Sequence, residues 1–219
     1  MNASGPPVRA SVYARIAPLY DLVYGAGLAP GRRRAMALLS LRPGERVLEV
    51  GIGTGAGSTE YPAGVSVIGV DLSWPMLRRA ARRLREEPAG ATLHLARMDG
   101  AELALPTGAF DAVYAPYMIN VVPDPVKVGL ELRRVCRHGG RIVLLNHFAG
   151  RHAGAHVAAR VAGRIAARLG DVDWHVDLDT FLQRTGLQAA CLERVNFAGV
   201  TSLVLCHVPS PHSRSPEEP

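Results

Sequence analysis

The spacing of hydrophobic residues changes along the chain, and the change predicts an alternation of helices and strands. Residues 9–41 have a helical period, because aromatic and aliphatic residues recur there at steps of three and four. These residues are Tyr13, Ile16, Tyr20 and Tyr24. Pro18 lacks a backbone N–H, so it ends one helix or begins another. A further helix is expected over residues 32–39, after Pro30.

From residue 46 onward, short apolar runs that end in glycine or a polar residue predict strands. The predicted strands are 46–50, 65–70, 92–96, 110–115, 141–146, 188–195 and 201–208. The predicted helices among them are 75–84, 125–136, 151–169 and 179–185. This alternation is typical of a mainly parallel α/β sheet, and the two consecutive strands at the end predict an antiparallel pair. Ligands of such sheets bind beyond the carboxyl ends of the strands, so the residues that follow each strand are the informative ones.

A glycine-rich segment follows the first predicted strand. It reads Glu49-Val50-Gly51-Ile52-Gly53-Thr54-Gly55. Glycine lets the backbone turn sharply and approach a ligand closely. Read as G-x-G-x-x-A, with Ala56 last, the segment fits a dinucleotide loop, although that pattern alone is a weak signal. Read as E-x-G-x-G-x-G, it fits the cofactor loop of S-adenosylmethionine (SAM) methyltransferases.

Carboxylates lie near the ends of three strands, and two of them, Glu49 and Asp99, favour the methyltransferase interpretation. Glu49 lies where a dinucleotide-binding strand usually has an apolar residue, and its carboxylate can accept bonds near the amino-acid end of SAM. Asp71 closes the second strand, where a carboxylate accepts both ribose hydroxyls in either class. Asp99 follows the third strand, and with the backbone N–H groups of Gly100 and Ala101 it can hold the edge of an adenine. The alternative is that Glu49 and Asp99 only cap turns.

On these segments the chain resembles the class I SAM-dependent methyltransferases, from about Tyr13 to Val208. The segments occur in the order of that family: VLEVGIGTG, VIGVDLS, MDGAELALP, FDAVYAPYMINVVPDP and RRVCRHGGRIVLLNHF. Within the superfamily the chain is most similar to the soluble bacterial phosphatidylethanolamine N-methyltransferases, through YARIAPLYDLVYG, EYPAGVSVIGVDLS, VVPDP and LLNHF. Methyltransferases of ubiquinone and menaquinone biosynthesis share the first two blocks only loosely. The acidic stretch GDVDWHVDLDTFL and His138, in place of a proline, depart from the family.

The resemblance implies a Rossmann-like, seven-stranded, mostly parallel sheet with helices on both faces and an antiparallel C-terminal strand pair. It implies one methyltransferase domain over residues 9–209, in which 9–41 form a helical lid. Residues 1–8 and 210–219 are expected to be flexible or disordered tails. The implied cofactor is SAM, and no metal is expected. The residues expected to bind SAM are Glu49, Gly51, Gly53, Gly55, Asp71, Leu72, Met76, Asp99, Gly100, Ala101 and Ala115.

Polar residues after the fourth and fifth strands, and in the N-terminal helices, are candidates for contact with the methyl acceptor. His147 and Tyr20 are expected to be catalytic, His147 by relaying a proton or contacting a phosphate. The residues expected to bind the acceptor are Tyr13, Asp21, Tyr117, Asn120 and Asn146. The alternatives are a His147 that only caps a strand end and an aromatic stripe, Tyr13 and Tyr20, that only packs on the sheet.

The implied reaction is N-methylation of the phosphatidylethanolamine headgroup and its methylated intermediates at a membrane surface. The alternative acceptor is a small soluble molecule, such as a quinone precursor or a secondary metabolite. A non-catalytic SAM- or nucleotide-binding protein and an NAD(P) oxidoreductase are further alternatives. The complete set of cofactor motifs argues against a non-catalytic protein.

The charge of the chain raises the question of an anionic partner. The 219 residues carry a net charge of +6, and of the 25 basic residues all but Lys127 are arginine, which suits phosphate groups. Codon bias explains the same composition. The helix at 151–169 has a basic stripe beside an apolar one, as in helices that lie on anionic membranes. The stripe consists of Arg160, Arg164 and Arg168. The alternative is a surface helix that packs on its own domain.

Nucleic acid is disfavoured as a partner. Methyltransferases that act on base amines usually have Asp or Asn, two prolines and an aromatic residue after the fourth strand, and residues 115–117 are Ala-Pro-Tyr. Three cysteines without C-x-x-C spacing indicate neither a zinc site nor a disulfide framework. The N-terminal residues have no apolar stretch. We therefore expect a cytoplasmic protein, associated peripherally with the inner face of the membrane if a lipid is the acceptor.

Overall fold

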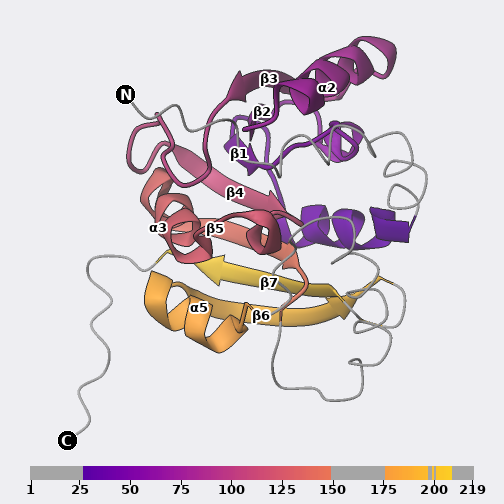
Figure 1. Cartoon of the computed structure of the whole chain (residues 1–219). Coiled ribbons are helices and arrows are strands. Elements are labelled where there is room, and N and C mark those ends of the chain that lie inside the picture. The colour runs from indigo at the N-terminus through magenta and orange to yellow at the C-terminus, as the bar shows by residue number, and fades with distance from the viewer. Residues whose placement is uncertain (1–26, 149–175, 197–198, 200, 209–219) are drawn as a thin grey trace, which may run out of the picture.

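A seven-stranded sheet forms the centre of the molecule, in the strand order β3-β2-β1-β4-β5-β7-β6 (Figure 1). The computed structural model describes residues 27–148, 176–196, 199 and 201–208. The strands are β1 (Arg46–Val50), β2 (Ser66–Asp71), β3 (Thr92–Arg97), β4 (Phe110–Pro116), β5 (Cys136–Asn146), β6 (Gln188–Val195) and β7 (Thr201–His207). All seven overlap the apolar runs that predict them.

The directions of the strands divide the sheet into two parts. The strands β3, β2, β1, β4 and β5 pair in parallel. The strand β7 pairs antiparallel with both β5 and β6. The central strands β1 and β4 are buried over most of their length, as expected for parallel strands that are covered on both faces. The predicted Rossmann-like, mostly parallel sheet with an antiparallel C-terminal pair is confirmed.

Alternate side chains of each parallel strand fill two separate hydrophobic cores. In β1, Leu48 and Val50 pack on one face, with α3 (Pro125–Val135) and α5 (Leu178–Thr185). Val47 packs on the other face, with the helix at residues 27–39. The remaining helical elements are α2 (Trp74–Glu86) and the 3-10 turns η1 (Ser58–Glu60) and η2 (Ile119–Val121).

Local sequence sets the ends of α3 and α5. Asp124 accepts the backbone N–H of Lys127 at 2.9 Å, and Asp177 accepts that of Thr180 at 2.8 Å. Aspartate is favoured at such positions because it satisfies an N–H that has no partner within the helix. The helix α5 ends at Gly186, whose φ of 65° is the left-handed conformation that glycine adopts without strain.

Two of the predicted boundaries are wrong. The helix predicted over 32–39 already includes residues 27–31, so Pro30 lies inside it. The strand predicted over 141–146 begins five residues earlier, at Cys136, so Gly139 and Gly140 are part of β5. Phe110 pairs with Cys136 and Ala112 pairs with Arg141, so the residues between them bulge from the ladder. The backbone N–H of Gly139 donates to the carbonyl of Val208, just after β7, and the N–H of Val208 donates to the carbonyl of Gly140. These two bonds keep the bulge in the sheet.

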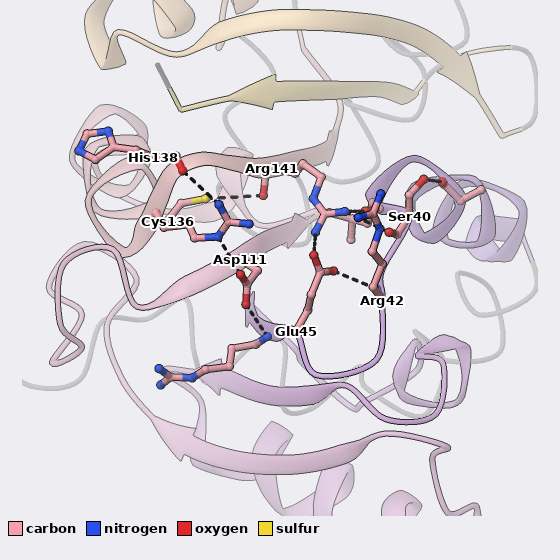
Figure 2. Close-up of polar contacts among 11 residues, drawn as sticks. Ser40, Arg42, Glu45, Asp111, Cys136, His138 and Arg141 are labelled. Atoms are coloured by element: carbon pink, nitrogen blue, oxygen red, sulfur yellow. Dashed lines mark hydrogen bonds and ion pairs between the residues drawn. The ribbon is translucent and has the colours of Figure 1, made fainter. Parts of the chain in front are cut away.

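The amino-terminal edge of the sheet is held by ion pairs between distant segments (Figure 2). Arg141 of β5 donates to Glu45 at 2.5 Å and to a backbone carbonyl at the end of the helix 27–39 at 2.6 Å. Asp111 accepts from Arg137 at 2.7 Å and from the first backbone N–H of β1 at 2.8 Å. We call Glu45, Asp111, Arg137 and Arg141 the basal clamp.

Some predicted segments lie outside the residues that the structure describes. They are the lid up to residue 26, the helix at 151–169 and the tails 1–8 and 210–219. Within the described part of the chain, no helix has the length and apolar character that crossing a membrane requires.

Candidate active site

The strand order reverses between β1 and β4, which lie side by side in the middle of the sheet (Figure 1). In a parallel sheet, the crevice at the carboxyl ends of the strands beside such a reversal is where ligands bind. Three segments with predicted functional residues meet this edge. They are the glycine loop 51–57 and the segments that follow β2 and β4.

Three glycines shape the loop after β1. Gly51 and Gly53 have φ values of 80° and 57°, which other residues rarely adopt. A Cβ atom on Gly51 would lie 2.8 Å from Met118, and one on Gly55 would lie 3.2 Å from Ala80 of α2. A Cβ atom on Gly53 would have no neighbour nearer than 4.0 Å. Gly51 and Gly55 therefore let the loop pack closely on the protein, whereas Gly53 presents open backbone.

The carboxylate of Asp71, at the end of β2, is fixed in direction by backbone N–H groups. Its Oδ2 accepts from Gly53 at 2.9 Å, and its Oδ1 accepts from Ser73 at 2.8 Å. Burial raises the pKa of Asp71, and these two hydrogen bonds oppose the rise. Each carboxylate oxygen retains further acceptor capacity. The arrangement can therefore accept two more hydrogen bonds beside the open backbone of Gly53.

The predicted adenine side lies after β3. Asp99 accepts the backbone N–H of Ala101 at 2.9 Å, so it does cap a turn, with one of its two oxygens. A Cβ atom on Gly100 would lie 3.1 Å from Val50, so glycine permits the turn to approach β1. Leu72, directly after β2, is 44% exposed and is available to a flat ligand. Two further predicted contacts, Met76 and Ala115, are buried beneath this edge.

Glu49 is buried on the face of the sheet that the helix 27–39 covers. Its carboxylate accepts the O–H of Tyr61 at 2.8 Å. The Nε of Arg32, from that helix, lies 3.7 Å from Oε1 of Glu60. The charge of Arg32 also acts on Glu49. Burial raises the pKa of Glu49 to about 7, because the bond from Tyr61 and the charge of Arg32 offset burial only in part. We call Arg32, Glu49, Glu60 and Tyr61 the acidic cluster.

Two buried hydroxyl groups lie beside the acidic cluster. Tyr114 pairs with Glu49 in the adjacent strand, and Ser58 precedes Glu60 closely in η1. Neither hydroxyl has a hydrogen-bond partner among the residues that the structure describes. A buried polar group without a partner is unfavourable. Polar groups of a ligand would therefore be stabilised at this place.

Four of the predicted acceptor-side residues meet at the ends of β4 and β5. Asn146 donates from its side chain to that of Asn120, and both residues are buried. The rings of Tyr117 and His147 lie 6.1 Å apart between centroids. Tyr117 has a φ of 53°, and its backbone N–H donates to the carbonyl of Leu145. Burial raises the pKa of Tyr117 to about 12, so its hydroxyl remains protonated at neutral pH.

The other predicted site residues are not part of the described structure. They are Tyr13, Tyr20 and Asp21 on the acceptor side, and Arg160, Arg164 and Arg168 of the membrane helix.

Several residues of the candidate site were not predicted from the sequence. Arg32, Glu60 and Tyr61 reach Glu49 from segments on both sides of it in sequence, and no spacing pattern connects them. Asn196, between β6 and β7, donates to the Tyr117 hydroxyl at 2.9 Å. In the sequence, Asn196 stands out only as a polar residue that interrupts the last apolar stretch.

Comparisons with known proteins agree with this geometry. Residues 48–144, from β1 to the middle of β5, match the family model described as a methyltransferase domain. Over this span the chain is similar to a methyltransferase domain. The span includes the glycine loop and the ends of β2, β3 and β4, so the match agrees with the predicted fold and cofactor.

Two curated relatives of the methyltransferase domain differ in their acceptors. A phosphatidylethanolamine N-methyltransferase of Cereibacter sphaeroides is 43% identical over 131 residues, which cover 60% of this chain and 64% of that protein. A demethylmenaquinone methyltransferase of Thermus thermophilus is 36% identical over 142 residues, covering 61% of this chain and 63% of that protein. The chain thus spans less than two thirds of the length of each.

A solved structure extends the likeness over most of the chain. The phosphoethanolamine N-methyltransferase 2 of Haemonchus contortus, solved in complex with SAM, superposes with a TM-score of 0.64 and 19% identity. The match covers 93% of this chain and 58% of that chain. At this identity the likeness shows the fold alone.

Proposed function

We propose that the methyltransferase domain transfers the methyl group of SAM to the amine of phosphatidylethanolamine, and to its methylated intermediates, at a membrane surface. The observation that carries the proposal is the 43% identity to a bacterial phosphatidylethanolamine N-methyltransferase. The blocks YARIAPLYDLVYG, VVPDP and LLNHF support the same acceptor.

The carboxyl edge of the sheet offers the groups that SAM needs. The Asp71 carboxylate would accept the two ribose hydroxyls, next to the open backbone of Gly53. Asp99 and the exposed Leu72 would hold the adenine. Glu49, with the unpartnered hydroxyls beside it, would face the charged amino-acid end. The residues present therefore fit this cofactor.

The chemistry asks little of the protein beyond positioning. When bound, SAM supplies a methyl group that its positive sulfur already activates, so the domain must align the amine with it. An amine attacks only when neutral, and in water a primary amine has a pKa of about 10. His147, at the end of β5 beside Tyr117, would accept that proton. The buried pair Asn120 and Asn146 would keep the acceptor end dry, which favours the neutral amine.

A small soluble acceptor is the second candidate. The 36% identity to a demethylmenaquinone methyltransferase favours it. In that case the nucleophile is a carbon or oxygen of an aromatic ring.

Incubation with labelled SAM and vesicles of phosphatidylethanolamine and phosphatidylglycerol tests the proposal directly. We expect label in mono-, di- or trimethylated phosphatidylethanolamine. The Asp71→Asn variant serves as the control that lacks the ribose contact. Methylation of demethylmenaquinone, with no labelled lipid, would replace the leading proposal by the second candidate.

Membrane association is a separate part of the proposal, because it depends on the sequence of the helix predicted at 151–169. The double variant Arg160→Glu/Arg164→Glu reverses the charge of its basic stripe. We expect it to lose co-sedimentation with anionic vesicles and to keep SAM binding. Unchanged co-sedimentation would show that this helix is not the membrane contact.

A further inference from the structure

Asn196 joins three parts of the molecule through one side chain. Its Oδ1 accepts the backbone N–H of Gly31 at 2.8 Å. Its Nδ2 donates to the hydroxyls of Thr201 at 3.0 Å and Tyr117 at 2.9 Å. Its φ of 64° is left-handed, a conformation that asparagine tolerates better than most residues. One loop residue therefore connects the helix 27–39, β7 and the acceptor side of the site.

The backbone of the helix decides which way this amide is turned. An N–H group can only donate, so the amide atom that faces Gly31 must be the oxygen. The nitrogen of Asn196 then necessarily faces Tyr117. The contact also requires glycine, because a Cβ atom on Gly31 would lie 2.7 Å from the amide oxygen. The N–H of Gly31, in the helix 27–39, thus determines that Asn196 donates the hydrogen bond to Tyr117.

The direction of that bond determines what the Tyr117 hydroxyl can do. Because its oxygen accepts from Asn196, its own hydrogen must point elsewhere. Within the described ranges, this O–H donates to no protein group. It lies beside His147, on the edge where the acceptor is expected.

We propose that Asn196 is a positioning residue that turns the Tyr117 O–H toward the methyl acceptor, where it donates to an oxygen atom. The inference rests on the proposed methyl transfer. The oxygen belongs to the phosphate of a phospholipid or to a ring oxygen of a quinone precursor. Either oxygen can accept a hydrogen bond. The other side chains at this edge that could donate to it include the buried amides of Asn120 and Asn146.

The variant Asn196→Asp reverses the hydrogen bond with almost no change in shape. Aspartate still accepts from Gly31, but the Tyr117 O–H now donates to the carboxylate and turns away from the acceptor. We expect kcat/KM for the acceptor to fall about tenfold, mostly through KM, as for the loss of one hydrogen bond to a charged group. The affinity for SAM should not change.

Two further variants separate positioning from a structural role. Tyr117→Phe should cause a similar loss, and the double variant no larger loss than Tyr117→Phe alone, because both changes remove the same hydrogen bond. Thr201→Val removes the other partner of the amide nitrogen and should leave the acceptor KM unchanged. Losses that add, or an equal fall in SAM affinity, would overturn the proposal.

A spectroscopic signal tests the same bond without turnover. The [13Cζ]tyrosine resonance that disappears in Tyr117→Phe should shift in Asn196→Asp and not in Thr201→Val. Short-chain phosphatidylethanolamine or a demethylmenaquinone analogue should shift it in the wild type and not in Asn196→Asp. A resonance that responds to neither contradicts the inference. If the wild-type protein methylates neither acceptor, the proposed function fails. That failure is seen in the turnover assay and not in the tyrosine resonance.

Discussion

Carboxyl groups at the two edges of the sheet have pKa values that are shifted in opposite directions. At the amino-terminal edge, burial alone would raise the pKa of Glu45 and of Asp111. Hydrogen bonds from arginine side chains and backbone N–H groups outweigh burial there, and both pKa values are lowered (Figure 2). At the carboxyl edge, burial is deeper and the direct donors are neutral. The pKa values of Glu49 and Asp71 are raised.

This difference separates a structural edge from the proposed binding edge. Glu45 lies just before β1 and Glu49 near its end, yet among the described residues only Glu45 of the two is bonded to a guanidinium group. The basal clamp compensates its own charges and has no need of a ligand. At the carboxyl edge the charges of Glu49 and Asp71 are compensated only in part, so a positively charged ligand would stabilise this edge. SAM carries such charge on its sulfur and its amino group.

The largest effect should come from removing the centre of the basal clamp. Arg141→Met leaves the half-buried Glu45 without its partner and removes bonds to the end of the helix 27–39. We expect the free energy of unfolding to fall by about 3 kcal/mol, as measured by urea denaturation. SAM affinity should be unchanged in the folded variant. A large loss of SAM affinity would mean that the two edges are not independent.

The corresponding change at the carboxyl edge is Asp71→Asn. It removes the charge that would accept the ribose hydroxyls, so the Kd for SAM should rise about a hundredfold by calorimetry, from two weakened charge-assisted bonds. The matched control at the other edge is Asp111→Asn, which should lower stability and leave the Kd unchanged. Equal SAM affinity in both variants would contradict the placement of the cofactor.

The raised pKa of Glu49 predicts that SAM binding depends on pH. A positive ligand favours the charged carboxylate and lowers its pKa, so binding releases a proton when the pH is below about 7. SAM affinity should therefore weaken as pH falls, by up to about tenfold per unit. The Glu49→Gln variant should bind SAM weakly and lose this pH dependence. Titration of SAM itself affects the variant and the wild type equally, so it does not change the comparison. Parallel pH profiles would show that Glu49 does not sense the cofactor.

The smallest effects should separate two glycines that share a left-handed backbone. Gly53 and Gly44 have φ values of 57° and 88°, and an added Cβ atom would meet nothing closer than 4.0 Å at Gly53 and nothing within 4 Å at Gly44. Alanine at either position should cost about 1 kcal/mol of stability, measured by thermal unfolding. Only Gly53→Ala should also weaken SAM binding, because Gly44 lies before β1 at the other edge. Equal SAM affinities would show that the Gly53 backbone does not contact the cofactor.

The sequence predicts the fold well because it has strong local signals. The parallel strands β1, β2 and β4 are largely buried apolar runs, and the loop after β1 needs its glycines. These three strands therefore begin or end within a residue or two of their predicted bounds. The error at β5 has a different cause. Gly139 and Gly140 have no apolar side chains, so the predicted strand starts only after them. Hydrogen bonds with Val208, distant in sequence, keep them in the sheet.

The candidate site is predictable only in part, for a related reason. Glu49 and Asp71 lie at the carboxyl ends of β1 and β2, so their proposed roles can be predicted from their positions in the sequence. Arg32 and Asn196 reach the site from the surrounding helix and loop, where tertiary packing determines which side chain arrives. Neither belongs to a motif with a fixed spacing.

A pair of calorimetric titrations of the wild-type protein, one with SAM and one with NAD, tests the placement of SAM at the carboxyl edge most directly. We expect saturable binding of SAM, retained in Arg141→Met and strongly weakened in Asp71→Asn, and no binding of NAD. Binding of NAD in place of SAM, or SAM binding that is the same in Asp71→Asn and the wild type, would contradict this placement.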